Sequence, residues 1–231
     1  MTKFLTIIFL CIISLSVKSQ PKGIKYTYVA TMSIKPGFLE IENEMVKQIM
    51  LERLRNDKKV YSLIVADNKY LFQKDVVESI DKMPLEVDVK TIYIDFNDST
   101  QIVQSTYGDN LYLVNSPLKK YHWILSSDSK EISGKTCYKA ILKNDPTITA
   151  WFTPDIPLGY APLGYYGLPG LVVSMETPIY TLNLKEITDV RDFKFIIPNE
   201  GKSILEKDFE RLINKNAKKI MDEAESIKEY K

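Results

Sequence analysis

His122 and Cys137 are the side chains of this chain with the widest chemical repertoire. His122 is the only histidine, and Cys137 is the only cysteine outside the first twenty residues. A Cys–His hydrolase would need a thiolate nucleophile, an imidazole base and an Asp or Asn to orient it. The fifteen-residue separation of the two residues neither supports nor excludes this pair. The alternative is that Cys137 is a small buried hydrophobic residue in a strand, since no neighbouring residue is expected to lower its pKa.

Acidic residues near turns are the second candidate for chemistry. They occur as Asp95 with Asp98, Asp128 with Glu131, and Asp189 with Asp192. Paired carboxylates can hydrolyse glycosidic bonds, but charged residues are also common in turns for structural reasons. The chain contains no phosphate-binding glycine motif and no Gly-x-Ser-x-Gly motif. The sequence therefore predicts no catalytic set, no cofactor and no metal site.

The segment from Ala150 to Val173 has an unusual composition. It contains four of the 11 prolines and four of the nine glycines, interspersed with aromatic residues. Leu168-Pro169-Gly170-Leu171 fits a type II turn, in which proline sets the first corner and glycine takes a positive φ at the second. Gly167, Pro169 and Gly170 are therefore expected to form a structural turn. Four large side chains are candidates for a ligand or partner surface, with closure of the core as the alternative: Trp151, Tyr165, Tyr166 and Leu168.

The elements that would position these residues are mostly strands. Short runs rich in β-branched and aromatic residues recur between polar turns, which is typical of an antiparallel meander that forms a curved sheet or half-barrel. One helix is expected after the first strand, at 38–55, and an amphipathic helix at 203–229, where Ser203 to Glu206 fits a capping box. The fold class is mainly β (α+β). The predicted strands are 24–34, 60–66, 69–72, 90–96, 101–107, 111–114, 121–125, 136–142, 147–153, 171–175 and 179–187.

The first nineteen residues have the pattern of a secretory signal peptide. A short basic start is followed by an apolar run from Phe4 to Val17, which is too short for a stable membrane span, and the small Ser19 closes the segment. An uncleaved anchor is the alternative. Residues 20–231 are expected to form a single domain that is not an integral membrane protein after cleavage.

The charge balance bears on partners. Removal of Lys3 and Lys18 reduces the basic residues from 31 to 29, against 30 acidic residues, which leaves a formal charge of −1. A nucleic-acid binder would show a clustered basic surface. The sequence therefore predicts no nucleic-acid partner.

Two segments together resemble a known family. The run Ala150–Pro157 followed by Gly167–Val172, with the cysteine segment Gly134–Ala140 before them, is similar to the GLPGLI family of exported Bacteroidetes proteins. The strong motifs cover residues 134–176. Asn144-Asp145-Pro146 replaces the Gly-Arg that members often carry, and Ala161-Pro162 replaces their Gly-Pro. The resemblance implies an exported, β-rich envelope protein, and the family has no established activity to transfer.

Three functions follow as expectations. The first is a non-enzymatic envelope protein, in the periplasm, at the outer membrane or secreted, that binds a lipid, a peptide or another apolar ligand, or a protein partner. The second is an accessory component of an outer-membrane transporter. The third is a hydrolase that uses Cys137 or a carboxylate pair.

Overall fold

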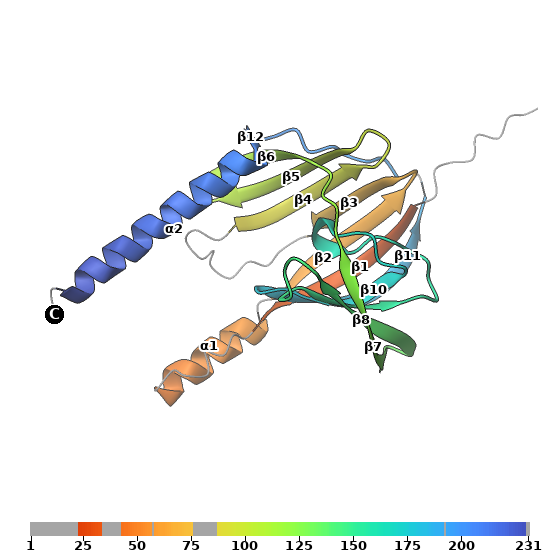
Figure 1. Ribbon diagram of the computed structural model, residues 1–231, viewed down its shortest axis with the longest axis horizontal. Helices are drawn as coiled ribbons and strands as arrows, with labels where there is room; N and C mark the ends of the chain where they lie inside the picture. The colour runs from red at the N-terminus through yellow and green to blue at the C-terminus, as the bar shows by residue number, and fades with distance from the viewer. Residues whose placement is uncertain (1–22, 34–42, 57, 76–86, 192, 230–231) are drawn as a thin grey trace, which may run out of the picture.

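A single sheet of twelve strands dominates the fold (Figure 1). The structure is a computed structural model that describes residues 23–33, 43–56, 58–75, 87–191 and 193–229. The predicted signal peptide therefore lies outside the described residues. The strands are β1 (Gly23–Met32), β2 (Lys58–Ala66), β3 (Lys69–Lys74), β4 (Val87–Asp95), β5 (Thr100–Tyr107), β6 (Asn110–Pro117), β7 (Trp123–Ile132), β8 (Lys135–Leu142), β9 (Thr149–Thr153), β10 (Leu171–Glu176), β11 (Tyr180–Val190) and β12 (Lys202–Leu205). The helices are α1 (Glu44–Asn56), α2 (Glu206–Glu229) and the short 3-10 turn η2 (Pro162–Gly164).

The strand order joins two antiparallel meanders. Strands β1 to β6 form one, β7 to β11 form the other, and the pairing of β1 with β11 connects them. The turns have the expected chemistry: Asp67 and Asn68 both take positive φ in the two-residue hairpin between β2 and β3. The mainly β, antiparallel fold class is confirmed, although β12 adds one parallel pairing with β6.

The sheet has to curve strongly because of one short connection. Strands β6 and β7 are ten strand steps apart in the sheet, a distance of about 48 Å if the sheet were flat. The connection from Pro117 to Trp123 can span only about 21 Å when fully extended. Figure 1 shows this crossing segment, residues 118–122, passing from β6 across the sheet to β7. The sheet is therefore a half-barrel, and in the part of the chain that the structure describes its edges are β12 and β7.

The inner face of the half-barrel holds the core. Its centre is a cluster of aromatic and aliphatic side chains in which Tyr61 stacks on Phe72 with ring centroids 4.9 Å apart. A second cluster continues over β8 to β10, and a third forms where Phe209 of α2 packs on Tyr107 and Tyr112. The inner loop, residues 154–170, packs on the first two clusters and so covers the middle of this face.

The two helices differ from their predicted limits. Ser203 lies in β12, where its Oγ accepts a hydrogen bond from the side-chain amide of Asn115 in β6. The helix α2 therefore begins at Glu206, and the predicted capping box is not formed. The described part of the first helix begins at Glu44, and the predicted residues 38–42 lie outside the described residues. Among the α1 side chains that the structure describes, Leu51 and Leu54 are buried, whereas Met45 and Ile49 are exposed.

Candidate functional site

The structure keeps His122 and Cys137 apart. The N–H of Lys143 donates to the carbonyl of His122, which extends the β7–β8 ladder, whereas Cys137 pairs with Lys130. Cys137 is six residues from Lys143, so the backbone positions of Cys137 and His122 are about 20 Å apart along the ladder. This register does not form the Cys–His pair considered from the sequence.

Cys137 has the surroundings of a structural cysteine. It is fully buried on the face of β8 opposite Tyr138, and its Sγ donates to the carbonyl oxygen of Lys135. Burial raises the pKa of the thiol, which opposes formation of a thiolate nucleophile.

The acidic pairs also lie in settings unlike those of paired catalytic acids. Asp95 is buried and bonded to Lys69, Tyr93 and the N–H of Asn97. Burial by itself would raise the pKa of Asp95, but these donors outweigh it and the pKa is lowered. Its predicted partner Asp98 is exposed in the following turn.

The other acidic pairs offer no enclosed site. Asp128 and Glu131 are exposed on the edge strand β7, Asp189 is exposed on β11, and Asp192 lies outside the described residues. Among the described residues, no group of three His, Cys, Asp or Glu side chains is placed to hold a metal ion. In the same part of the chain, no helix is long and apolar enough to cross a membrane.

Of the four predicted surface residues, Leu168 is buried in the core, and Tyr165 and Tyr166 are partly buried against it. Leu168 is buried, and Tyr165 packs against the second apolar cluster and against Tyr121 of the crossing segment. Tyr166 is half-buried, and its hydroxyl donates to the carbonyl of Lys119. These side chains therefore join the inner loop to the crossing segment, which is the closure role that the sequence left as an alternative.

Trp151 lies on the opposite face of the sheet. Its neighbours Ala150 and Phe152 point into the inner cluster, and strand alternation turns Trp151 outward. There the ammonium of Lys130 lies 3.9 Å from the centroid of the indole ring. The structure thus separates Trp151 from the three inner-loop residues with which it was grouped.

The glycine motif does not form the predicted type II turn. Gly170 lacks a positive φ, and the N–H of Leu171 donates to the carbonyl of Ile156. Gly170 is required for a different reason, because a Cβ there would lie 2.1 Å from the carbonyl oxygen of Thr153. Gly167 is the residue with positive φ, at +91°, and Pro169 is exposed.

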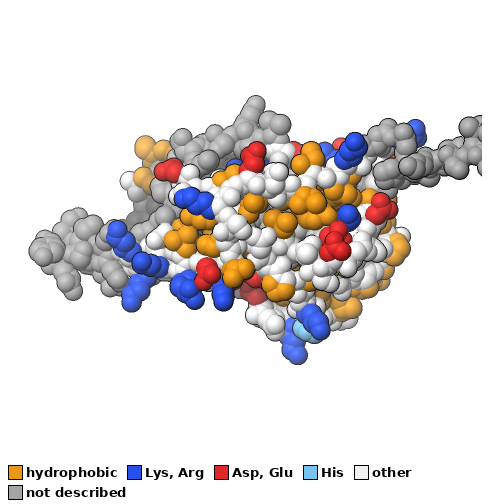
Figure 2. Space-filling view, turned by 90° about the horizontal axis from the view of Figure 1, so that it is seen from above, with side chains coloured by type: hydrophobic (Ala, Val, Ile, Leu, Met, Phe, Trp, Pro, Cys, Tyr) orange, Lys and Arg blue, Asp and Glu red, His pale blue; other side chains and the backbone are white. Residues whose placement is uncertain are grey.

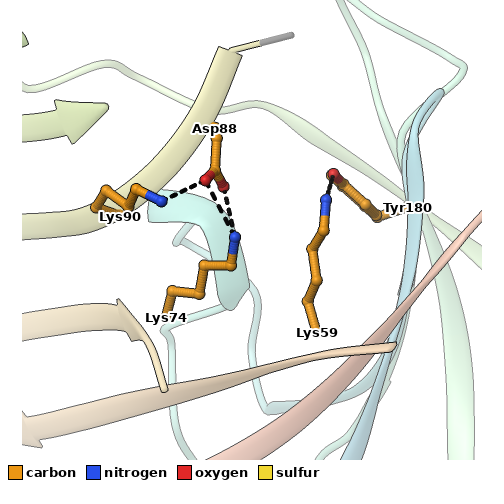
Figure 3. A network of polar contacts seen from close by, with 5 residues as sticks. All are labelled: Lys59, Lys74, Asp88, Lys90 and Tyr180. Atoms are coloured by element: carbon orange, nitrogen blue, oxygen red, sulfur yellow. Dashed lines mark hydrogen bonds and ion pairs between the residues drawn. The ribbon is translucent and has the colours of Figure 1, made fainter. Parts of the chain in front are cut away.

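A polar group at one end of the inner face was not singled out from the sequence. We call it the lysine cluster: Lys59 of β2, Lys74 of β3, Asp88 and Lys90 of β4, and Tyr180 of β11 (Figure 3). Lys74 donates to both carboxylate oxygens of Asp88, at 2.9 and 3.1 Å, and Lys90 donates to the same carboxylate. The ammonium of Lys59 donates to the Tyr180 hydroxyl and lies 4.6 Å from that ring's centroid.

The lysine cluster, like Asp95, is mostly removed from water. The Lys74 and Asp88 side chains are only 8% and 14% exposed. Burial lowers the pKa of Lys74 more than Asp88 raises it, and repulsion from Lys90 acts in the same direction as burial. By contrast, Figure 2 shows basic side chains gathered at the surface toward the end of the molecule that carries α2.

A period of two in the sequence could have revealed the lysine cluster. Lys74 follows Tyr70 and Phe72 on the inner face of β3, and Lys59 precedes Tyr61 and Leu63 on the inner face of β2. Both lysines therefore fall on the apolar face of an alternating strand. What the sequence could not supply was the register that brings them close to Asp88.

Comparison with known proteins adds limited information. A family model described as a protein of unknown function (Porph_ging) matches residues 141–174, which lie within the segment 134–176 that carries the family resemblance. The GLPGLI resemblance itself stays a prediction. No curated protein sequence matches the chain.

Two solved structures of PNGF-II, in the C2 and P21 space groups, show a partial likeness. They match with TM-scores of 0.48 and sequence identities of 13% and 14%, each over 83% of this chain. The chain spans about a third of the length of these solved proteins, 32% and 33%.

Proposed function

We propose that this protein is an exported, non-enzymatic binding protein of the cell envelope that takes an apolar or amphipathic ligand. The observation that carries the proposal is the lysine cluster at the end of an apolar inner face. Tyr61 and Phe72 are buried beside the lysine cluster, and Val89 packs against the same apolar cluster. Apolar side chains beside a few convergent polar groups are the usual composition of a small-molecule site.

The dispersal of the reactive groups supports binding rather than catalysis. A nucleophile needs a base within hydrogen-bond reach and a site for the developing charge. Cys137 has no such base among its partners in the β7–β8 ladder. The carboxylate of Asp95 already accepts hydrogen bonds from Lys69, Tyr93 and the N–H of Asn97.

Native mass spectrometry of the chain purified gently from the envelope of its own cells tests the ligand. We expect a bound molecule at fixed stoichiometry, whose mass is lost after unfolding and refolding and regained on incubation with an envelope lipid extract. A bare chain that takes up nothing from that extract would contradict the proposal.

Export needs a separate test, because it depends on the predicted signal peptide. Fractionation should place the wild-type chain in the envelope or the medium. Leu10→Arg, which interrupts the apolar run with a charge, should retain it in the cytoplasm. Equal distribution of the two chains would count against export by this segment.

A protein partner is the second candidate, and the open edge at β7 favours it. Among the described residues this strand has a ladder partner on one side only, in β8, and its Ile124 and Leu125 are exposed. An edge strand with exposed apolar side chains can accept a strand from another chain. An accessory component of an outer-membrane transporter would dock in this way.

Site-specific photo-crosslinking in the native cell distinguishes this candidate. A crosslinker at Leu125 should capture an outer-membrane protein, whereas one at the exposed Lys185 of β11 should not. Identical adducts from both positions, or none from Leu125, would remove the edge-docking candidate.

A further inference from the structure

We propose that Lys74, Lys90 and Ser105 bind the anionic head group of an amphipathic ligand, a carboxylate or a phosphate. This inference rests on the proposed function, since it assumes that the inner face accepts the apolar body of that ligand. It adds the chemical class of the ligand and the side chains that would recognise it.

The first argument is the balance of charge. Two ammonium groups, from Lys74 and Lys90, converge on one carboxylate, Asp88. A single carboxylate cannot neutralise both, so this trio carries a net positive charge. Lys74 and Asp88 are mostly removed from water and Lys90 is 33% exposed, so water screens the excess charge less than it screens a fully exposed lysine, and the trio attracts an anion more strongly.

Donor capacity is the second argument. An ammonium group has three N–H donors and no acceptor. Lys90 donates one hydrogen bond to Asp88, and Lys74 donates one to each oxygen of the same carboxylate. A second anion could therefore bind without breaking the contacts to Asp88. Lysine ammonium groups are flexible point charges, and so they suit either a carboxylate or a phosphate.

Ser105 provides a third, independent argument. It is fully buried, and its Oγ has no hydrogen-bond partner among the described residues. Ser105 lies on β5 directly opposite Val89, and the register irregularity between Val89 and Thr91 contains Lys90. A buried hydroxyl without a partner is costly, and an anion in this region would accept its hydrogen bond.

The surroundings explain why the anion should belong to an amphipathic molecule. Phe72 and Tyr61 precede the lysines on the inner face and belong to the first apolar cluster. Val87 and Val89 flank Asp88 in the sequence. Val87 packs on the third cluster, which contains Phe209 of α2, and Val89 packs on the first cluster. A bound ion would therefore lie at a boundary between charged and apolar surface.

Calorimetric titration of the full folded chain with four probes tests the inference. The probes are dodecanoate, dodecyl phosphate, dodecanol and inorganic phosphate. We expect both anionic amphiphiles to bind at least tenfold more tightly than dodecanol or inorganic phosphate. The double variant Lys74→Met with Lys90→Met should lose at least tenfold in affinity for dodecanoate, and Ser105→Ala a few-fold.

Asp88→Asn gives a result of opposite sign. It removes the internal carboxylate that competes for the lysines while keeping a similar shape, so dodecanoate should bind several-fold more tightly. Lys185→Met, at an exposed position of β11, is the matched control and should change nothing. A purely structural cluster would lower the melting temperature in both sets of variants without moving affinity in opposite directions.

The remaining outcomes separate this inference from the proposed function. Equal affinity for dodecanoate and dodecanol, unaffected by the lysine variants, overturns the head-group site but leaves an apolar-ligand protein. Inorganic phosphate binding as tightly as dodecyl phosphate overturns the amphipathic assignment. Failure of every amphiphile to bind overturns the proposed function, and the inference with it.

Discussion

Single residues in this fold act mainly by closing the inner loop onto the sheet. The buried hydroxyl of Tyr70 donates to the carbonyl of Ala161 and accepts from the N–H of Gly164, each at 2.8 Å. The hydroxyl of Tyr28 donates to the carbonyl of Val172 at 2.7 Å. Tyr70 therefore provides partners for two backbone groups of the inner loop, and Tyr28 provides one for the carbonyl at the register irregularity of β10. The abundance of tyrosine is thus explained in part by this loop.

Gly170→Ala should destabilise the protein by about 2–3 kcal/mol, because the new Cβ would overlap the backbone of Thr153 and no rotamer change can relieve a backbone clash. The measurement is the free energy of unfolding from urea titration. Gly159→Ala is the control: its Cβ would meet the nearest atom at an ordinary 3.5 Å, and we expect a change within about 0.5 kcal/mol. Equal effects of the two substitutions would contradict this account of Gly170.

Asp95 should contribute a pH-dependent part of the stability. Its pKa in the folded state is lowered from 3.8, so its contribution is present above pH 3.8 and is lost as the pH falls through the folded value. Asp95→Asn should therefore cost about 2 kcal/mol at pH 6, and this difference should shrink below pH 3.8.

Urea unfolding at pH 6, 4 and 3 gives the comparison for Asp95. Asp98→Asn, at an exposed position of the same turn, serves as the control and should follow the wild type at each pH. A loss of stability in Asp95→Asn that stays constant from pH 6 to pH 3 would show that the carboxylate charge is not the stabilising feature.

At the scale of elements, α2 and the inner loop are attached in different ways. The inner loop is tied to the crossing segment by a hydrogen bond and by ring contacts with Tyr121. It is also tied to β7, because the indole N–H of Trp123 donates to the carbonyl of Tyr166 at 3.0 Å. α2 is attached through β12, which pairs in parallel with β6, and through Phe209. The helix is therefore anchored at its first turns, where the strand before it fixes its starting point.

Phe209→Ala should destabilise the protein by about 3 kcal/mol, since it removes the side chain that fills the space between Tyr107 and Tyr112. Leu205→Ala, at a residue that is more than half exposed and lies just before α2, should cost less than about 0.5 kcal/mol. Thermal and urea unfolding, read by circular dichroism, compare the two. If Leu205→Ala were the more damaging substitution, the anchoring of α2 through Phe209 would be wrong.

The whole molecule is an open half-barrel held in shape by long-range contacts. The pairing of β1 with β11 joins strands from opposite ends of the chain, and the crossing segment brings the β6 and β7 halves together. Because such contacts link residues far apart in sequence, we expect unfolding to be a single cooperative transition. Groups buried in the sheet should then become accessible only when the entire sheet opens.

Cys137 tests this cooperativity. In a chain with Cys11→Ser, the remaining thiol should react with Ellman's reagent at pH 8 roughly a hundredfold more slowly than in urea, because burial excludes the reagent and raises the thiol pKa. The labelling rate should rise with urea in step with unfolding. The control is Thr136→Cys combined with Cys11→Ser and Cys137→Ala; its exposed thiol should react quickly in the folded protein. Fast labelling of native Cys137 would instead support a reactive thiol.

The sequence by itself indicated most of the strands and the hairpin turn at Asp67-Asn68, and it favoured burial of Cys137. These features depend on neighbours in the chain: alternation places side chains on one face or the other, and Asp67-Asn68 encodes its own hairpin. The sequence also located the segment 134–176, part of which a family model matches. It could not show that Ser203 pairs in a strand, because that depends on β6, ninety residues away.

Only the tertiary structure decided which residues meet. Trp151 and Tyr165 are close in sequence, yet they lie on opposite faces of the sheet. The inner loop places Tyr165 on the inner face, and Trp151 lies on the outer face against Lys130. Lys74 and Asp88 come together because of the pairing of β3 with β4, not because of any motif in either strand. The pairing register of the strands and the path of the inner loop are set by the packing of the whole core. Local sequence patterns show only the periodicity of each strand. The lysine cluster, the site we propose for the ligand's charge, is therefore a product of the fold.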